Sequence, residues 1–240
     1  MTSRSKSPRD HRRLIHENLP IVNFKVLIVG DRAVGKTSLI RRFVSGTFGD
    51  TTATLGVDFH WKRLERKLGT VSLQLWDVAG QEVPGEMTRV FYQGCTGVII
   101  VADKTRPESV LSARRWREEV SVKLADNQPI CYLAMNKADL VDLTSSIRGI
   151  SNQRAISDAE LDTYCGDGED QFDHWQDVSA CTGEGVQKLF ESLTDEMIRR
   201  TGVIDILKSE ARRMSKQSVR LQTKQRKEDA EVSVKKRCNC

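Results

Sequence analysis

The sequence predicts an α/β domain with a doubly wound, mostly parallel sheet and helices on both of its faces. Two observations lead to this prediction. Between Phe24 and Arg200, short apolar runs typical of buried strands alternate with amphipathic segments of helical length, and the first run ends at a glycine. Hydrophobic residues make up 38% of the 240 residues, which is enough to bury a core and excludes a wholly disordered chain.

The elements can be predicted in order along the chain. Six segments have the apolar content of strands: Phe24–Val29, Val57–Leu64, Val71–Trp76, Gly97–Val101, Ile130–Met135 and Trp175–Val178. The second and third flank a turn at Leu68-Gly69-Thr70 and are predicted to form a hairpin. Four segments are predicted helices: Thr37–Val44, Pro107–Leu124, Ser157–Tyr164 and Val186–Arg200. Residues 141–156 are predicted to form a polar loop, and the chain beyond Thr201 is predicted to be largely disordered.

The net charge of +5 is distributed unevenly. Residues 1–20 carry +3 and residues 208–240 carry +7, which leaves −5 for residues 21–207. An acidic body with basic ends is not the pattern of a groove that binds nucleic acid, so no nucleic-acid partner is expected. No apolar run approaches the ~20 residues of a membrane-spanning helix, and the N-terminus lacks the apolar stretch of a secretory signal. A protein facing the cytosol is therefore predicted.

A phosphate-binding loop follows the first predicted strand, where the sequence GDRAVGKTS matches the pattern G-x₄-G-K-[ST]. Glycines let backbone N–H groups face phosphates, and the following helix N-terminus favours anions. Lys36 is expected to reach the β- and γ-phosphates, and the Thr37 hydroxyl to ligate Mg²⁺. The loop residues predicted to contact the nucleotide are Gly30, Arg32, Ala33, Val34, Gly35, Lys36, Thr37 and Ser38.

Three further segments indicate guanine rather than adenine. The motif Asn136-Lys137-Ala138-Asp139 follows a predicted strand, Trp76–Glu82 reads WDVAGQE, and Ser179-Ala180 follows a short strand. A carboxylate such as that of Asp139 accepts hydrogen bonds from guanine N1 and N2, whereas adenine presents no such pair of donors. The four-letter motif is weak alone, but in this order after a phosphate loop it is specific.

With these motifs in this order, the sequence resembles the Ras superfamily of small GTPases and, within it, the Rab family. The resemblance covers residues 24–200 and the terminal cysteines, and includes the segments LGVDF at Leu55–Phe59 and FYQGC at Phe91–Cys95. The stretches LQLWD, MTRVFY and FDHW most resemble the Rab branch that serves lysosome-related organelles. The resemblance implies the P-loop small-GTPase fold, with a mostly parallel six-stranded sheet and one antiparallel edge strand. It also implies a slow GTPase that binds GTP or GDP with Mg²⁺ and acts in membrane trafficking.

The same resemblance implies roles for the residues around the phosphates. Thr37 and Thr54 would ligate Mg²⁺, and Asp77 would hold it through water. Gly80 would sense the γ-phosphate through its N–H, and Gln81 would orient the attacking water.

The resemblance likewise implies the residues that contact the base and the effectors. The base contacts are expected from Phe48, Asn136, Lys137, Asp139, Ser179, Ala180 and Cys181. An aromatic triad of Phe59, Trp76 and Phe91 would display the nucleotide state to effector proteins. Residue type leaves simpler alternatives open: Phe48 and the triad as core aromatics, and Lys137 as a surface lysine.

Several positions depart from the Rab pattern. Arg32 stands where Rab proteins often have a small residue, and Ala33 stands where most relatives have glycine. Arg32 is expected either to crowd Gln81 and slow hydrolysis or to point into solvent. Val83-Pro84 replaces an Arg-Phe pair, which puts the order of the second switch in doubt because proline disfavours a helical preceding residue. Cys181 replaces the lysine of the SAK guanine motif.

The interval from Phe48 to Thr54 is also one residue shorter than in most relatives and lacks their usual tyrosine. None of these changes removes a residue expected to act in hydrolysis, so a GTPase is predicted. The alternative is a GTP-locked recruitment scaffold with negligible hydrolysis. An ATP-using phosphotransferase is disfavoured by the NKAD motif.

The chain ends in KKRCNC, which is not the C-a-a-X signature but resembles the C-x-C end of Rab proteins. On such an end Cys238 and Cys240 would both be geranylgeranylated, although the motif alone also fits two inert thiols or a weak metal hook. Two lipid chains anchor stably where one is marginal, and Lys235-Lys236-Arg237 would add about 1 kcal/mol each at an anionic leaflet.

The predicted organisation has three parts. Residues 1–22 form a basic flexible extension, residues 23–201 the GTP-binding domain, and residues 202–240 a basic hypervariable tail. The expected location is the cytoplasmic face of an endomembrane, with a soluble cytosolic pool. The expected partners are effectors, an exchange factor, a GTPase-activating protein, prenylation and membrane-extraction chaperones, and the lipid membrane.

Overall fold

A computed structural model describes residues 21–66, 69–80, 89–125, 128–141, 156–166, 168, 170–203, 205, 207–209 and 212–213. The chain divides into two compact units. The larger unit comprises Asn23–Arg63 and Ser72–Arg200, and it holds every described residue of the candidate site. Of the described residues, the second unit comprises those within Leu64–Val71, residues 21–22 and those from Thr201 onward. Within it, the Thr70 hydroxyl donates a hydrogen bond to Glu65 over 3.0 Å.

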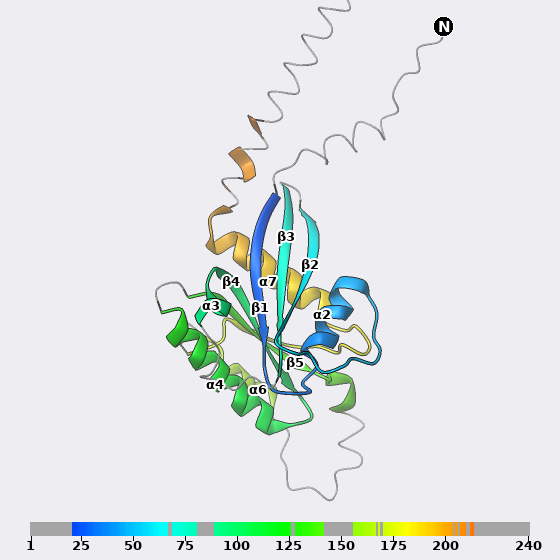
Figure 1. The fold of residues 1–240 in the computed structure, drawn as a ribbon. Helices are drawn as coiled ribbons and strands as arrows, with labels where there is room; N and C mark the ends of the chain where they lie inside the picture. The colour runs from blue at the N-terminus through cyan, green and yellow to red at the C-terminus, as the bar shows by residue number, and fades with distance from the viewer. Residues whose placement is uncertain are drawn as a thin grey trace, which may run out of the picture. The chain divides into compact units, whose positions relative to one another are not determined.

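Six strands of the described residues form one mixed sheet in the order β2-β3-β1-β4-β5-β6 (Figure 1). The strands are β1 (Ile21–Val29), β2 (Val57–Arg66), β3 (Gly69–Val78), β4 (Cys95–Asp103), β5 (Ile130–Asn136) and β6 (His174–Asp177). Strands β2 and β3 are antiparallel, whereas β1, β4, β5 and β6 pair in parallel. The predicted mostly parallel six-stranded sheet with one antiparallel edge strand is confirmed.

Helices pack on both faces of this sheet. They are α2 (Lys36–Ser45), α3 (Arg89–Tyr92), α4 (Pro107–Lys123), the 3₁₀ helix η1 (Ala138–Leu140), α6 (Asp158–Asp162) and α7 (Val186–Arg200). On one face, α4 buries Trp116 against alternate residues of β4 and β5 such as Ile100 and Leu133. On the other face, α7 packs so closely that a side chain on Gly97 would lie 2.9 Å from Met197.

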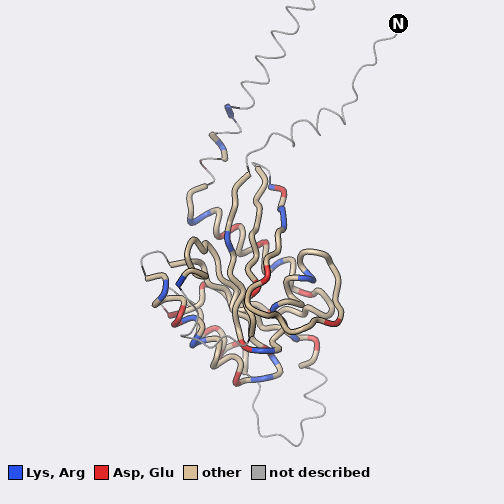
Figure 2. Tube along the Cα trace, viewed as in Figure 1, with Lys and Arg blue, Asp and Glu red and all other residues tan. Residues whose placement is uncertain are grey.

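The apolar periodicity of α7 explains which of its faces is buried. In α7, Val186, Leu189, Phe190, Leu193 and Met197 are all buried, as the helical spacing predicts. Helix α2 joins α7 on the same side, where the rings of Phe43 and Phe190 stack with centroids 3.9 Å apart. Both acidic and basic residues lie along α4 (Figure 2), so this helix carries both signs of charge. Among the helices that the structure describes, none has the length and apolar content to cross a bilayer.

The parallel register brings the carboxyl ends of three strands to one edge of the sheet. Asp103 at the end of β4 pairs with Asn136 at the end of β5, and Met135 pairs with Asp177 at the end of β6. The candidate site lies at this edge, as expected for a doubly wound sheet.

Several predicted boundaries differ from the structure. The turn placed at residues 68–70 was wrong in part, because Gly69 and Thr70 already belong to β3. Helix α6 covers only Asp158–Asp162, with the side chain of Ser157 accepting a hydrogen bond from the Glu160 N–H at its start. The sequence did not predict α3 and η1, since four and three residues are too few for a helical period to emerge. Residues 203, 205, 207–209 and 212–213 are helical, although the apolar pattern fades there.

Candidate functional site

The phosphate loop connects β1 to α2 and curls around its own backbone. Gly35 has a φ of 97°, and a Cβ there would collide with the side-chain amide of Asn136. Only glycine meets both conditions, because it tolerates positive φ and has no side chain. Ala33 also lies in the left-handed region, with a φ of 62°. This conformation turns the loop toward the first turn of α2, whose N–H groups have no partners within the helix.

Lys36, the first residue of α2, folds back across the loop. Its ammonium donates hydrogen bonds to the carbonyl oxygens of Gly30 at 2.7 Å and Asp31 at 3.0 Å. The side chain is only 6% exposed. Burial lowers the pKa of Lys36 to about 8, against the opposing influence of the Asp77 and Asp31 carboxylates. Lys36 therefore places a buried positive charge against the phosphate loop, where it can pair with an anion.

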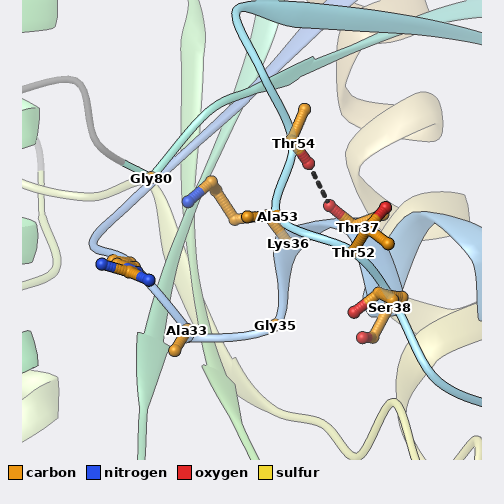
Figure 3. Close-up of a pocket in the computed structure, with 11 residues that line it drawn as sticks. Ala33, Gly35, Lys36, Thr37, Ser38, Thr52, Ala53, Thr54 and Gly80 are labelled. Atoms are coloured by element: carbon orange, nitrogen blue, oxygen red, sulfur yellow. Dashed lines mark hydrogen bonds between the residues drawn. The ribbon is translucent and has the colours of Figure 1, made fainter.

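Three oxygen-bearing side chains converge beside Lys36. The hydroxyl oxygens of Thr37 and Thr54 lie 2.8 Å apart (Figure 3). The Thr37 hydroxyl also donates to Asp77 Oδ2 over 2.6 Å. Within the described part of the chain, the buried Oδ1 of Asp77 has no hydrogen-bond partner. Burial raises the pKa of this carboxyl group, although the Thr37 hydroxyl opposes the shift.

The unpartnered oxygen indicates what the cluster fits. Leaving a buried carboxylate oxygen without a donor or cation costs free energy. Hydroxyl and carboxylate oxygens are the donors that Mg²⁺ prefers. Thr37, Thr54 and Asp77 thus form a donor set that suits a small hard cation.

Lys36, Thr37 and Thr54 line a cavity of about 230 Å³. It is lined by Arg32, Ala33, Gly35, Lys36, Thr37, Ser38, Thr51, Thr52, Ala53, Thr54 and Gly80 (Figure 3). Gly80 closes one side, where a Cβ would lie 2.7 Å from both the Lys36 nitrogen and the Arg32 Cα. Backbone N–H groups, an ammonium and hydroxyls around one hollow are the groups that bind phosphates.

A second cavity of about 370 Å³ adjoins the first and shares four lining residues with it. It is lined by Ala33, Gly35, Ser38, Phe48, Thr51, Asn136, Lys137, Asp139, Leu140, Ala180 and Cys181. Of the predicted base contacts, only Ser179 is absent from this wall. Ser179 is buried, and its hydroxyl accepts a hydrogen bond from the Thr182 N–H over 2.9 Å. Phe48 is 50% exposed, so it is not a core aromatic.

Asn136 braces the second cavity rather than projecting freely into it. Its Nδ2 donates to the Val34 carbonyl over 2.8 Å, and its Oδ1 accepts from the Ala180 N–H over 3.0 Å. Both polar atoms of the Asn136 amide are thus hydrogen-bonded to other protein groups. This one side chain ties the phosphate loop to the segment that follows β6.

Two residues at this site were not predicted from the sequence. Arg42 of α2 donates to the carbonyl oxygens of Ala180, at 2.8 Å, and of Cys181. Asp103 at the end of β4 forms an ion pair with Lys137, with 2.7 Å between the carboxylate oxygen and the ammonium. A carboxylate ending a buried parallel strand could have been noticed as a candidate. Nothing in the local sequence around Arg42 indicates a contact 138 residues away.

The three members of the predicted aromatic triad have different surroundings. Phe59 is 45% exposed and packs edge-on against Trp76, with ring centroids 4.6 Å apart. Trp76 and Phe91 are partly buried and pack on the core under α4. The ammonium of Lys25 lies 3.6 Å above the Trp76 ring and donates to the Gln93 carbonyl, so it bridges β3 and the end of α3.

The remaining predicted residues have mixed outcomes. Val34 is fully buried and lines neither cavity. Arg32 is exposed at the rim of the first cavity, and its carbonyl accepts a hydrogen bond from Arg106 over 3.1 Å. Gln81, Val83-Pro84 and the terminal cysteines Cys238 and Cys240 lie outside the described residues.

A phosphate loop and adjoining cavities at the carboxyl edge of a six-stranded sheet define a nucleotide-binding protein of the P-loop class. The sequence profile of the Ras family matches residues 25–199, and the chain therefore belongs to that family. Membership implies that it binds a guanine nucleotide.

Within that family the chain is a small GTPase related to the Rab proteins. It is 38% identical to Ras-related protein Rab-32B of Dictyostelium discoideum over 73% of this chain and 64% of that protein. It is 33% identical to human Ras-related protein Rab-7L1 over 74% of this chain and 84% of that protein. It is 31% identical to GTP-binding protein YPT52 of Saccharomyces cerevisiae over 74% of this chain and 82% of that protein. The matched region thus spans less than two thirds of Rab-32B. The predicted resemblance to the Rab family, and within it to the branch associated with lysosome-related organelles, is confirmed.

Proposed function

We propose that this chain is a GTP-driven molecular switch that slowly hydrolyses GTP to GDP and phosphate. In the GTP-bound state it recruits effector proteins to an endomembrane. One observation carries this proposal: a cavity with phosphate-binding groups and a cation-binding corner adjoins a cavity with a guanine-reading carboxylate. The two cavities share the lining residues Ala33, Gly35, Ser38 and Thr51, as one nucleotide that occupies both would require.

Binding follows from the groups at each cavity. The loop N–H groups and Lys36 would hold the β- and γ-phosphates, and Asp139 would accept from guanine N1 and N2. Phe48 and the aliphatic stem of Lys137 would cover the base. Arg42 fixes the backbone of Ala180, whose N–H is already held by Asn136, so this wall of the base cavity is rigid.

Hydrolysis would depend mainly on positioning and on charge stabilisation. Thr37 and Thr54 would ligate Mg²⁺ and Asp77 would hold it through water, which is consistent with the unpartnered Asp77 oxygen. Bound Mg²⁺ would neutralise charge on the β- and γ-phosphates. The Gly80 N–H would contact the γ-phosphate, and Gln81 would orient the attacking water.

Recruitment would use the surface of Phe59, Trp76 and Phe91. Thr54 and Gly80 line the phosphate cavity and lie close in sequence to Phe59 and Trp76, so a γ-phosphate could change this surface. Membrane attachment would use geranylgeranyl groups on Cys238 and Cys240. The relatives named Rab support a role in membrane trafficking, with regulators that exchange and hydrolyse the nucleotide.

The first experiment is to extract and identify the nucleotide that copurifies with the full chain. GDP or GTP is expected, and an adenine nucleotide would overturn the proposal. Single-turnover hydrolysis of loaded GTP should then be measured with Gln81→Leu as the comparison. The variant should retain GTP but hydrolyse it at least about tenfold more slowly.

The second candidate is a GTP-locked scaffold with negligible hydrolysis. It is favoured by one observation, the exposed Arg32 at the rim of the phosphate cavity beside Gly80. If this side chain slows hydrolysis, Arg32→Ser should raise the single-turnover rate by about tenfold. A rate that rises little would remove Arg32 as the cause. GTP that persists for many hours in both proteins would favour the scaffold.

A further inference from the structure

We propose that Asp103 is a positioning residue that fixes Lys137 along the wall of the base cavity and, through Arg106, holds the phosphate loop. It would thereby slow the release of bound GDP. This role rests on the proposed nucleotide-binding function. Asp103 lines neither cavity itself, so it would act only through its two basic neighbours.

Asp103 is a buried carboxylate with both oxygens fully engaged. The side chain is 2% exposed at the end of β4. Its Oδ1 accepts from the N–H and the hydroxyl of Thr105 at 3.0 and 2.7 Å. Its Oδ2 accepts from Lys137 at 2.7 Å and from Arg106 at 3.1 Å. Burial alone would raise the pKa of Asp103, but the donors from Lys137 and Thr105 outweigh it and lower the pKa, so the group is ionised at neutral pH.

The partner Lys137 is held in a conformation that needs support. Its φ is 63°, in the left-handed region, which is unfavourable for a residue other than glycine. The ion pair fixes the far end of its side chain, so the stem between the backbone and the ammonium cannot swing away from the cavity it lines. Asp103 and Asn136 are paired in the sheet register, which fixes the distance between the two strands that carry this pair.

The second arm reaches the phosphate loop. Arg106 donates through Nε to Asp103 and through Nη2 to the Arg32 carbonyl, over 3.1 Å in each case. The Arg106 N–H also donates to the Asp103 carbonyl over 2.8 Å. One carboxylate therefore restrains the base-covering lysine and the backbone of the phosphate loop together. Moving Lys137 away from its cavity would break its ion pair with Asp103. Moving the phosphate loop would break either the bond from Arg106 to Asp103 or the bond from Arg106 to the Arg32 carbonyl.

A neighbouring ion pair provides a matched control. Lys104, the next residue, pairs with Asp177 at the end of β6 and lies 3.8 Å from Asp158. It belongs to the same edge of the sheet but lines neither cavity. Its backbone N–H, which donates to the Asn136 carbonyl, is kept in Lys104→Ala. This variant removes a similar ion pair without touching the two walls.

The test is the release rate of fluorescent N-methylanthraniloyl-GDP from the full chain, chased with excess GDP. Asp103→Ala is expected to release it about tenfold faster than wild type, and Asp103→Asn about threefold faster because the amide keeps one acceptor. Arg106→Ala should also show about a threefold increase. Lys104→Ala should stay within about twofold of wild type.

The decisive measurement is a double-mutant cycle between Asp103→Ala and Lys137→Ala. If the carboxylate acts through the lysine, Asp103→Ala should add only the contribution of Arg106, so the double variant should release GDP no more than about threefold faster than the faster single variant. Inosine diphosphate should show the same fold-changes, because the lysine stem covers the ring face and not the edge that carries the 2-amino group. If Asp103→Ala only weakened the fold in general, the increases in release rate of the two single variants would multiply in the double variant.

Three results would overturn the assignment: multiplying effects in the cycle, equal acceleration by Lys104→Ala, or no change in Asp103→Asn and Asp103→Ala. Wild-type protein that retains no guanine nucleotide would instead defeat the proposed function itself. If Asp103→Ala does not fold, the same cycle is run with Asp103→Asn, and multiplying effects there would overturn the assignment equally.

Discussion

Two parts of the candidate site differ in how their polar groups are satisfied. The base-facing corner is the part of the second cavity around Asn136 and Lys137, and the cation-facing corner is Asp77 with the residues beside it, including Lys36. At the base-facing corner, both ends of the Asn136 amide bond other protein groups, and Lys137 is paired with Asp103. At the cation-facing corner, one oxygen of Asp77 is buried without a partner among the described residues. Lys36, beside it, is buried with a lowered pKa.

The difference indicates two kinds of construction within one site. The base-facing corner is a preformed part of the fold, whose hydrogen bonds contribute to stability whether or not a ligand is bound. The cation-facing corner holds charged groups whose burial costs free energy until an anion and a cation join them. Variants at the first corner should lower stability, whereas variants at the second should lower binding alone.

The largest effect is expected at the phosphate end of the cation-facing corner. Lys36→Met should weaken GDP binding by on the order of 100-fold, because it removes charge-assisted hydrogen bonds to the phosphates. The nucleotide-free protein should lose less stability than it does in Asn136→Ala, because removing a buried ammonium offsets the loss of its hydrogen bonds to the Gly30 and Asp31 carbonyls. Equilibrium GDP titration and urea unfolding measure the two quantities. A comparable loss of stability would break the distinction between the corners.

The base-facing corner should show the opposite pattern in the nucleotide-free protein. Asn136→Ala is expected to lower its free energy of unfolding by about 2 kcal/mol, because the Val34 carbonyl and the Ala180 N–H lose their partner. Asp77→Asn should leave that free energy unchanged or raise it, because burial disfavours the charged carboxylate. Urea unfolding in EDTA compares the two. Equal destabilisation by both variants would contradict the contrast.

The next largest effect is expected from removal of the metal, which should change nucleotide release through the cation-facing corner and not through the base-facing corner. Chelation by EDTA is expected to speed GDP release from the wild type by on the order of tenfold, since Mg²⁺ would hold the phosphates through this corner. In Asp77→Asn the ratio of release rates with and without EDTA should fall below about twofold, whereas Asp103→Ala should keep the wild-type ratio. A full EDTA effect in Asp77→Asn would exclude that carboxylate from metal binding.

The smallest effect is a pH dependence of phosphate binding. Lys36 loses its proton with a pKa of about 8 in the nucleotide-free protein, and bound phosphates must raise this pKa because they favour the charged form. Binding is then coupled to proton uptake above pH 8, so GDP affinity should fall by about fourfold from pH 7 to pH 8.5. Lys36→Arg stays protonated and should give a flat curve. The same fall in both proteins would assign it to another group.

The sequence predicted the fold well because its signals are local. Apolar runs of strand length and the period of α7 survive in any sequence window, and the phosphate loop is a contiguous motif. The missed elements were α3 and η1, which are too short to show a period. Gly69 was assigned to the turn because glycine favours turns, whereas the pairing of the hairpin places it in β3.

The candidate site was predictable only where its residues lie in motifs. The residues of the guanine motif line the base cavity, but their supports come from elsewhere in the chain. Arg42 reaches Ala180 across the fold, and the sheet register brings Asp103 next to Asn136. Such contacts depend on tertiary placement. The position of Asp103 at the end of a buried strand marks it as a candidate, but no local pattern indicates which residues Asp103 or Arg42 contacts. Ser179 illustrates the reverse case, since it belongs to a base-reading motif yet is buried away from the cavity.

The departure at Cys181 gives this protein a convenient chemical handle. Burial raises the thiol pKa of Cys95 and Cys131 to about 12, which makes them poor nucleophiles, whereas Cys181 is exposed on the wall of the base cavity. In a chain whose two terminal cysteines are changed to serine, a maleimide dye should label Cys181 in preference to these buried thiols. Its fluorescence would then report nucleotide exchange in real time with unmodified GTP and GDP.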